Sequence, residues 1–325
     1  MIPSYARGCI APTFSIFRSD LSFDPDGQCR FLDFLLDRGG ISAFFVRSGM
    51  GQMFTFSYED VQAMARTACS HLKGRAAVLV GTTGIWDRDR NNYPDPAVFV
   101  NEAVELSRYA EEQGADGVVH TIPEAILPRD GQTEADVILD YFETVSAAVS
   151  IPTFIYQPPG TAAAYNVTHE LLAKLADMPN MAGIKVSTAD AGYIATLCAA
   201  VYGRDFAYIK GNENAFYAGL YCGSTAVIGQ GAAMYPQMLN FLQERFEAGD
   251  AVSAVMAQHA VYKLVAFNIN SVEFFKRYAT EQGYPVDGYA RPMKGVDYVK
   301  AIGNVSEEQY AAYKCLLEEE LAPYL

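Results

Sequence analysis

The sequence predicts an α/β fold, namely a (β/α)8 TIM barrel with a C-terminal helical segment. Short apolar runs alternate with longer, helix-like runs from about residue 8 to about residue 235, and this alternation is typical of a parallel sheet covered by helices. Eight strand candidates favour a closed barrel over an open sheet. The chain of 325 residues is 50% apolar, so it can bury the core of one barrel and an appendage.

The expected elements follow in chain order. The strand candidates are residues 8–17, 42–47, 76–80, 117–121, 153–156, 182–186, 206–209 and 225–228. The helix candidates between them are residues 26–37, 57–71, 96–113, 133–149, 168–176, 189–201 and 213–221. After Pro236 only helical patterns remain, over residues 236–248, 250–268, 272–282 and 306–321. We therefore expect two parts, a barrel over residues 1–235 and a helical segment over residues 236–325.

Composition excludes several classes of function. A net charge of −14 and a pI near 4.7 disfavour binding to nucleic acid or to an anionic membrane. The six cysteines and four histidines show no metal-ligand spacing, so we expect neither a metal site nor a redox pair. Residues 1–10 lack the apolar core of a signal peptide, and no run has the length of a membrane span. A cytoplasmic protein with a small-molecule substrate is expected.

Lys185 lies near the end of an apolar run, where an ammonium is costly to bury. A buried strand would lower the pKa of this lysine, and its free amine could then attack a carbonyl to form a Schiff base. The alternative is a lysine whose stem covers apolar surface while its head reaches solvent. Tyr156, near the end of the preceding strand candidate, would reach the same end of a parallel barrel as Lys185, where such barrels carry their chemistry.

An ordered set of motifs resembles the dihydrodipicolinate synthase and N-acetylneuraminate lyase family over about residues 8–310. The motifs are Ala11-Pro12-Thr13-Phe14, Gly114-Ala115-Asp116-Gly117, Tyr156 with Pro159-Gly160, Gly183-Ile184-Lys185, Gly211-Asn212-Glu213 and Pro236. The resemblance implies an eight-stranded barrel in a homo-oligomer, usually a tetramer. It also implies that Lys185 forms a covalent imine with a pyruvate-like 2-oxo acid, that Tyr156 shuttles protons, and that no further cofactor is needed.

The departures from the family pattern concern the substrate. Where the family carries two hydroxyl residues to hold the substrate carboxylate, this chain has Gly49 and Met50, whose backbone amides could still form an anion nest. The synthases' relay tyrosine is replaced within Pro123-Glu124-Ala125, and their carboxylate-binding arginine falls on Thr161 or Ala162. The chain is therefore not expected to be a typical dihydrodipicolinate synthase.

Further residues are candidates for substrate contacts. Ser187 resembles the hydroxyl residue of sugar-acid lyases, and Gly229 and Gly231 occupy a position where the family lets substrate approach the backbone, although a phosphate site is possible there too. Gln157 could orient a substrate hydroxyl or bond nearby backbone. His120 could contact substrate or donate a proton, but a packed histidine is the preferred interpretation. Glu124 could act as an acid or pair with His120, whereas a solvated loop carboxylate is preferred.

One insertion, residues 86–96, is peculiar to this chain and follows the third strand candidate. It contains Trp86, Arg88 and Arg90, and we expect either a substrate lid or a subunit contact, with no preference. Asp87, Asp89 and Asn91 mimic the start of a calcium loop, but the glycine and the bidentate glutamate that such a loop needs are missing.

The primary hypothesis is a class I aldolase or lyase that releases pyruvate from a 2-keto-3-deoxy sugar acid or a related hydroxy-oxo acid. A dehydratase that uses the same imine is a close alternative. A non-catalytic barrel that binds an oxo acid or sugar acid is the second hypothesis, and a metal-dependent barrel enzyme is the third.

Overall fold

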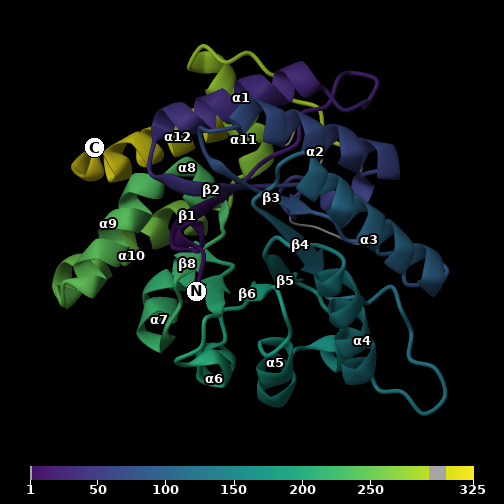
Figure 1. Ribbon diagram of the computed structural model, residues 1–325. Helices are drawn as coiled ribbons and strands as arrows, with labels where there is room; N and C mark the ends of the chain where they lie inside the picture. The colour runs from purple at the N-terminus through teal and green to yellow at the C-terminus, as the bar shows by residue number, and fades with distance from the viewer. Residues whose placement is uncertain (1, 293–304) are drawn as a thin grey trace.

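The computed structural model describes residues 2–292 and 305–325. In this part of the chain eight parallel strands form a closed barrel in sequence order, and β8 pairs with β1 (Figure 1). The predicted TIM barrel is thereby confirmed. The strands are β1 (Gly8–Pro12), β2 (Ile41–Val46), β3 (Ala77–Gly81), β4 (Gly117–Thr121), β5 (Thr153–Gln157), β6 (Met181–Val186), β7 (Ala207–Lys210) and β8 (Ala226–Val227).

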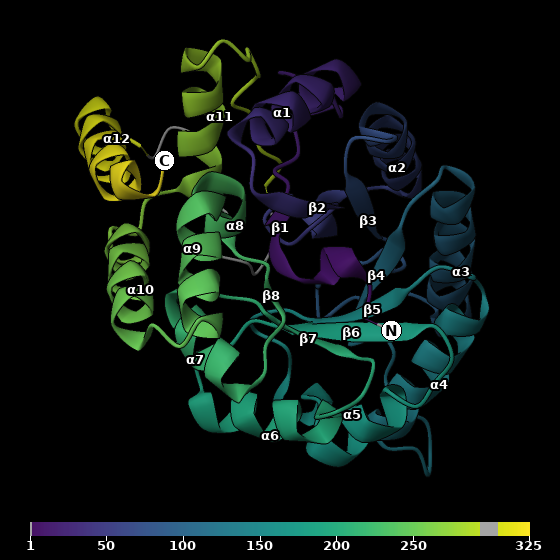
Figure 2. The ribbon, with the colours of Figure 1, turned by 60° about the vertical axis from the view of Figure 1, so that its left-hand side comes forward.

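Helices surround the barrel, as Figure 2 shows. Those that follow the strands are α1 (Pro25–Arg38), α2 (Tyr58–Leu72), α3 (Pro96–Glu112), α4 (Glu134–Ala147), α5 (His169–Leu175), α6 (Ala191–Val201), α7 (Phe216–Cys222) and the short α8 (Gln230–Met234). The C-terminal segment contains α9 (Pro236–Glu247), α10 (Ala251–Ala266), α11 (Ser271–Glu281) and α12 (Glu307–Leu321), which gather beside α1 and α8 in Figure 2. Short 3-10 turns include η2 (Met53–Thr55), η3 (Ala163–Tyr165) and η4 (Glu213–Ala215).

Capping residues explain where several helices begin. Ser57 and Asp60 form a reciprocal capping box at α2, with aspartate in the place of the usual glutamate. Thr133 and Asp136 do the same at α4, and the Thr168 side chain accepts from the Leu171 amide at α5. Each such cap contributes about 1 kcal/mol to helix stability.

The barrel interior is filled by alternate side chains of the strands. Tyr156 belongs to the inner cluster with Phe45 and Phe154, whereas Ile155 and Ile184 face the outer helices. Lys185 pairs in register with Tyr156 across the β5–β6 ladder. Because register partners in a parallel pair lie on the same face of the sheet, Lys185 also faces inward.

Four elements differ from the sequence prediction, and one of them, the short helix α8, was not predicted. The first strand stops at Pro12 instead of residue 17, because the chain then turns and Gln28 bonds the backbone of Phe14 and Ile16. The predicted helix at residues 213–221 begins with the 3-10 turn η4, and α7 starts only at Phe216. The eighth strand is shorter than expected and covers Ala226–Val227.

The C-terminal segment is joined closely to the barrel. The Cys9 thiol on β1 donates to the Pro236 carbonyl at 3.6 Å, and Met238 and Leu239 of α9 are buried in the same apolar cluster. The expected division at residue 235 stays a prediction. Across residues 2–292 and 305–325, none of the helices is both long and apolar enough to cross a bilayer.

Candidate active site

A cavity of about 320 Å³ opens at the carboxyl end of the strands. Five residues predicted for the site line this cavity, namely Met50, Tyr156, Lys185, Ser187 and Gly229. They come from β5, β6 and the loops after β2, β6 and β8, so the fold brings distant parts of the sequence together at one place. The C-terminal segment contributes Val265 of α10 to the wall.

Lys185 stands against the face of the Tyr156 ring. Its Nζ lies 3.7 Å from the ring centroid, and the residue is only 7% exposed. Burial lowers the pKa of Lys185 to about 7, with the Glu213 carboxylate opposing and the Lys210 cation adding to the effect. About half of the amine is therefore neutral at pH 7, which is the form that can attack a carbonyl.

A buried carboxylate and a second buried lysine accompany this amine. The Lys210 Nζ donates to the Asn212 Oδ1 at 3.2 Å and to the Thr188 carbonyl, and it thereby ties the end of β7 to the loop after Lys185. Burial lowers the pKa of Lys210 to about 8, and Glu213 opposes this shift. Burial also raises the pKa of Glu213, although hydrogen bonds and Lys210 act in the other direction. The cavity therefore has a buried acid, Glu213, that interacts electrostatically with the Lys185 amine.

Glu213 is held by the loop after β8. Its Oε1 accepts from the Gly231 amide at 2.9 Å and from the Tyr235 hydroxyl at 3.3 Å. A Cβ atom at Gly229 would come within 1.9 Å of the Glu213 Oε2, so a larger residue there would have to displace the Glu213 carboxylate. Gly231 uses its amide for Glu213 and, unlike Gly229, is not among the residues that line the cavity.

Asn214, next to Glu213, presents a polar atom without a partner. Its Oδ1 is buried and accepts no hydrogen bond from any residue in the described part of the chain. Asn214 lines the cavity together with Asn212 and Gln230. A buried acceptor left unbonded is costly, and a hydroxyl of a bound ligand would satisfy it.

The turn after β2 is fixed by its own hydrogen bonds. The Ser48 hydroxyl donates to the Thr13 carbonyl at 3.1 Å and accepts from the Gly51 amide at 3.0 Å. The Gly49 carbonyl accepts from the Gln52 amide at 3.1 Å. Met50 reaches the cavity, while Gly49 is not among its lining residues.

Gln157 does not reach the cavity. Its Oε1 accepts from the Val167 amide and the Tyr193 hydroxyl, both at 3.0 Å, and its Nε2 donates to Asn166 at 3.0 Å. The side chain lies on the outer face of β5, opposite to the neighbouring Tyr156. The geometry thus favours the backbone-bonding interpretation of Gln157.

His120 is also placed outside the cavity. Its Nδ1 lies 2.9 Å from the Tyr141 hydroxyl, and its Nε2 lies 3.1 Å from the hydroxyls of both Thr82 and Ser107. Burial, with help from the Arg47 cation, lowers the pKa of His120 to about 3, so the ring is neutral. His120 is a packed, hydrogen-bonded histidine under α3 and α4, and the substrate-contact interpretation does not match its position.

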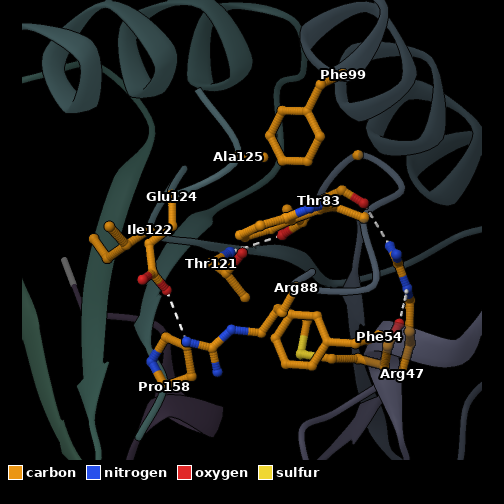
Figure 3. Close-up of a pocket in the computed structure, with 13 residues that line it drawn as sticks. Arg47, Phe54, Thr83, Arg88, Phe99, Thr121, Ile122, Glu124, Ala125 and Pro158 are labelled. Carbon is orange, nitrogen blue, oxygen red and sulfur yellow. Dashed lines mark hydrogen bonds and ion pairs between the residues drawn. The ribbon is translucent and has the colours of Figure 1, made fainter. Parts of the chain in front are cut away.

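Glu124 is neither solvated nor paired with His120. Its side chain is 4% exposed and forms 2.8 Å ion pairs with Arg88 and Arg90 of the 86–96 insertion. Figure 3 shows the Arg88 side chain running between Phe54 and Glu124 in a second, very small pocket. The preferred interpretation of Glu124 as a solvated carboxylate was wrong, because an arginine-rich loop from β3 covers it.

The sequence reasoning did not assign several lining residues to the site. Glu213 and Asn212 were recognised only as a family motif, although their position directly after β7 could have placed them. Asn214, Gln230 and Pro159 likewise follow strand ends. Val265 carries no comparable signal, because it lies in a helix outside the strand–helix alternation. Groups of three or more His, Cys, Asp or Glu side chains suited to a metal are absent from residues 2–292 and 305–325.

Comparisons with known proteins agree with this geometry. Residues 5–298 match the model of the dihydrodipicolinate synthetase family. The chain is 28% identical over 250 residues to YagE of Escherichia coli K12, a protein named as a candidate 2-dehydro-3-deoxy-D-gluconate aldolase, with 76% of each chain covered. The crystal structure of YagE in complex with pyruvate has a TM-score of 0.76 at 24% identity, covering 97% of this chain and 98% of that one. The sialic acid aldolase of Ruminococcus gnavus has a TM-score of 0.82 at 18% identity, covering 99% and 100%.

Proposed function

Since the chain belongs to the dihydrodipicolinate synthetase family, we propose that it is a class I carbon–carbon lyase, an aldolase that releases pyruvate from a 2-keto-3-deoxy sugar acid. The observation that carries this proposal is the buried Lys185 amine, whose pKa is lowered to about 7, at 3.7 Å from the Tyr156 ring in a cavity at the carboxyl end of the barrel. Members of this family are class I enzymes that use a lysine imine in place of an external cofactor.

The proposed reaction begins when the neutral Lys185 amine adds to the 2-oxo group. The Tyr156 hydroxyl gives its proton to the hydroxyl of this adduct, which leaves as water, so that a protonated imine and the Tyr156 phenolate remain. The bond between the third and fourth carbons then breaks, and its electron pair moves into the imine to form an enamine. Tyr156, as phenolate, takes the proton of the fourth-carbon hydroxyl, and an aldehyde departs. Tyr156 returns the proton to the third carbon, and hydrolysis of the imine releases pyruvate and the free lysine.

Substrate recognition is proposed at two ends of the cavity. The Gly49 and Met50 amides donate no hydrogen bond within the described residues and could hold the carboxylate. At the other end, Ser187, Asn214 and Glu213 offer groups for sugar hydroxyls. Gly229 would let the substrate approach the backbone closely.

The charge of the cavity points to the kind of aldehyde that is released. Among the described lining residues Lys185 is the sole cation, and Glu213 is a buried acid. An anionic aldehyde half would therefore be poorly accommodated, whereas a neutral polyhydroxyl chain fits the amide and hydroxyl groups. We propose an unphosphorylated sugar acid, such as the 2-dehydro-3-deoxy-D-gluconate in the name of YagE. The role of a typical dihydrodipicolinate synthase is not proposed, because Pro123-Glu124-Ala125 lacks the relay tyrosine and neither Thr161 nor Ala162 is the arginine that the synthases carry.

The test is a screen of 2-keto-3-deoxy sugar acids, with and without a phosphate group, in which pyruvate release is followed with lactate dehydrogenase. Unphosphorylated acids should be cleaved, and their phosphorylated counterparts should be cleaved at least tenfold less efficiently. Borohydride reduction with pyruvate present should add a pyruvate-derived mass to Lys185. An unmodified lysine would favour the non-catalytic binding hypothesis, and loss of water from the substrate without pyruvate release would favour the dehydratase.

We also propose a homo-oligomer in the cytoplasm. Val252, Val255, Met256 and Tyr262 are 48% to 77% exposed and recur at helical spacing on α10, which suits contact with a second copy of the chain. Light scattering after size-exclusion chromatography measures the assembly, and a monomeric mass would contradict the proposal.

A further inference from the structure

The insertion after β3 crosses the end of the barrel and holds the loop that follows β5. Arg88 donates from Nη1 to the Pro159 carbonyl at 3.2 Å and from Nη2 to the Gly160 carbonyl at 3.1 Å. Arg90 donates to the same Gly160 carbonyl at 2.8 Å. The Arg88 side chain is 8% exposed, whereas the Arg90 side chain is 50% exposed and Gly160 lies at the surface.

Glu124 of the β4 loop joins the two arginines to the β5 loop. Its Oε2 accepts from Arg88 and its Oε1 from Arg90, both at 2.8 Å, and Oε1 also accepts from the Ala162 amide at 2.8 Å (Figure 3 draws the Arg88 contact). Three successive loops of the barrel are therefore connected through one buried carboxylate. Such charge-assisted bonds, when buried, hold a geometry firmly.

The insertion itself is well organised. Trp86 stacks on Tyr93 with ring centroids 5.6 Å apart and donates from Nε1 to the Asn92 carbonyl at 3.1 Å. Arg88 has a φ of +61°, a left-handed conformation that costs a non-glycine residue energy unless its surroundings enforce it. The Phe54 ring, 5.1 Å from the Arg88 Cζ, packs on the guanidinium and completes those surroundings.

The segment that is held in this way forms part of the candidate active site. Residues 158–162 directly follow β5, which carries Tyr156, and Pro159 lines the cavity next to Lys185 and Tyr156. The carbonyls that Arg88 binds belong to Pro159 itself and to Gly160. A shift of this loop would move the cavity wall without touching Lys185.

We propose that Arg88 and Glu124 are positioning residues that fix the 158–162 loop and thereby set the shape of the cavity for the aldehyde half of the substrate. Neither residue touches the reacting atoms. Formation of the imine with pyruvate alone does not need this wall, whereas binding of a longer sugar acid does. The catalytic part of this inference rests on the proposed aldolase function, but the structural part does not.

The experiment compares R88A and the double variant R88M/E124Q with the control R129A, which removes a charge from an exposed residue of the neighbouring β4 loop. The double variant removes both buried charges together, so it remains informative if R88A folds poorly. Hydrogen exchange, followed by mass spectrometry on peptides covering residues 157–166, reports the loop, and the sole tryptophan, Trp86, reports the insertion through acrylamide quenching. Trapping of pyruvate by borohydride measures imine formation at Lys185. KM and kcat are measured with the sugar acid that the parent protein cleaves most efficiently.

In R88A and the double variant, exchange of the amides of residues 160–162, which follow the two prolines of this loop, should be at least tenfold faster and Trp86 more accessible to acrylamide, with R129A unchanged. KM for the sugar acid should rise about tenfold, while the rate of pyruvate trapping stays within twofold of the parent protein. Unchanged exchange would overturn the inference whether or not the protein is an aldolase. Faster exchange with an unchanged KM, or trapping that falls as much as cleavage, would also overturn it. Failure of the parent protein to trap pyruvate would instead contradict the proposed function.

Discussion

The pH dependence of imine formation follows directly from the burial of Lys185. Its pKa is lowered to about 7, so about one tenth of the amine is neutral at pH 6, about half at pH 7 and about nine tenths at pH 8. An exposed lysine would have on the order of one neutral amine in a thousand at pH 7. The trapping rate should therefore rise about fivefold from pH 6 to pH 7 and then level off.

The assay is reduction of the pyruvate imine with cyanoborohydride between pH 5.5 and pH 9, followed by peptide mass spectrometry. Lys276 is an internal control, because burial lowers its pKa to about 7 as well, yet its Nζ donates to the Tyr289 carbonyl at 2.6 Å and it is not among the residues that line the cavity. The label should appear on Lys185 and not on Lys276. A rate that keeps rising tenfold per pH unit beyond pH 8.5 would refute the assignment of a lowered pKa, and label on Lys276 would refute the argument that the cavity selects the amine.

Three further predictions concern single substitutions. Y156F should lower turnover about 100-fold or more, because the proton shuttle is lost, while trapping of pyruvate persists; a drop of less than tenfold in kcat would contradict this role. K185M should raise the free energy of unfolding by about 4 kcal/mol at pH 7 and by less than about 1 kcal/mol near pH 10. The reason is that between pH 7 and about 10.5 the lysine binds a proton in the unfolded chain but not in the folded one. Urea unfolding at several pH values measures the difference in stability between the variant and the parent protein, and a difference independent of pH would contradict the prediction. G229A should displace Glu213, lower the melting temperature and abolish sugar-acid cleavage. The control G288A, at a glycine whose added Cβ would meet nothing within 4 Å and whose φ is not positive, should retain cleavage. Full activity in G229A would contradict the packing argument.

The barrel and the buried position of Lys185 could be predicted because local patterns determine them. Strand–helix alternation indicates parallel strand pairing. A lysine at the end of an apolar run indicates a functional position, because burying its ammonium group is costly. The inward orientation of Lys185 and Tyr156 follows from the two-residue period of the strands. These features depend on a few neighbouring residues, which the sequence displays directly.

The surroundings of the site could not be predicted in the same way. Glu124 looks like a loop carboxylate in the sequence, and only the folded chain brings Arg88 and Arg90, about 35 residues earlier, onto it. His120 follows the pattern of a strand-end residue, but the strand period turns it outward to Thr82, Ser107 and Tyr141. Val265 reaches the cavity from a helix whose docking depends on the whole barrel.

The short β8 has a consequence for how the barrel opens. Each of its two ladders joins only two residue pairs, Gly8 and Cys9 on one side and Ile209 and Lys210 on the other. The β1–β8 ladder joins segments that are more than two hundred positions apart, so its closure has a large entropic cost and only two residue pairs to offset it. Ile228 and Gly229 lie immediately beyond β8, so local opening of this ladder would displace one wall of the cavity, whereas Lys185 lies in the β5–β6 ladder, which pairs five positions.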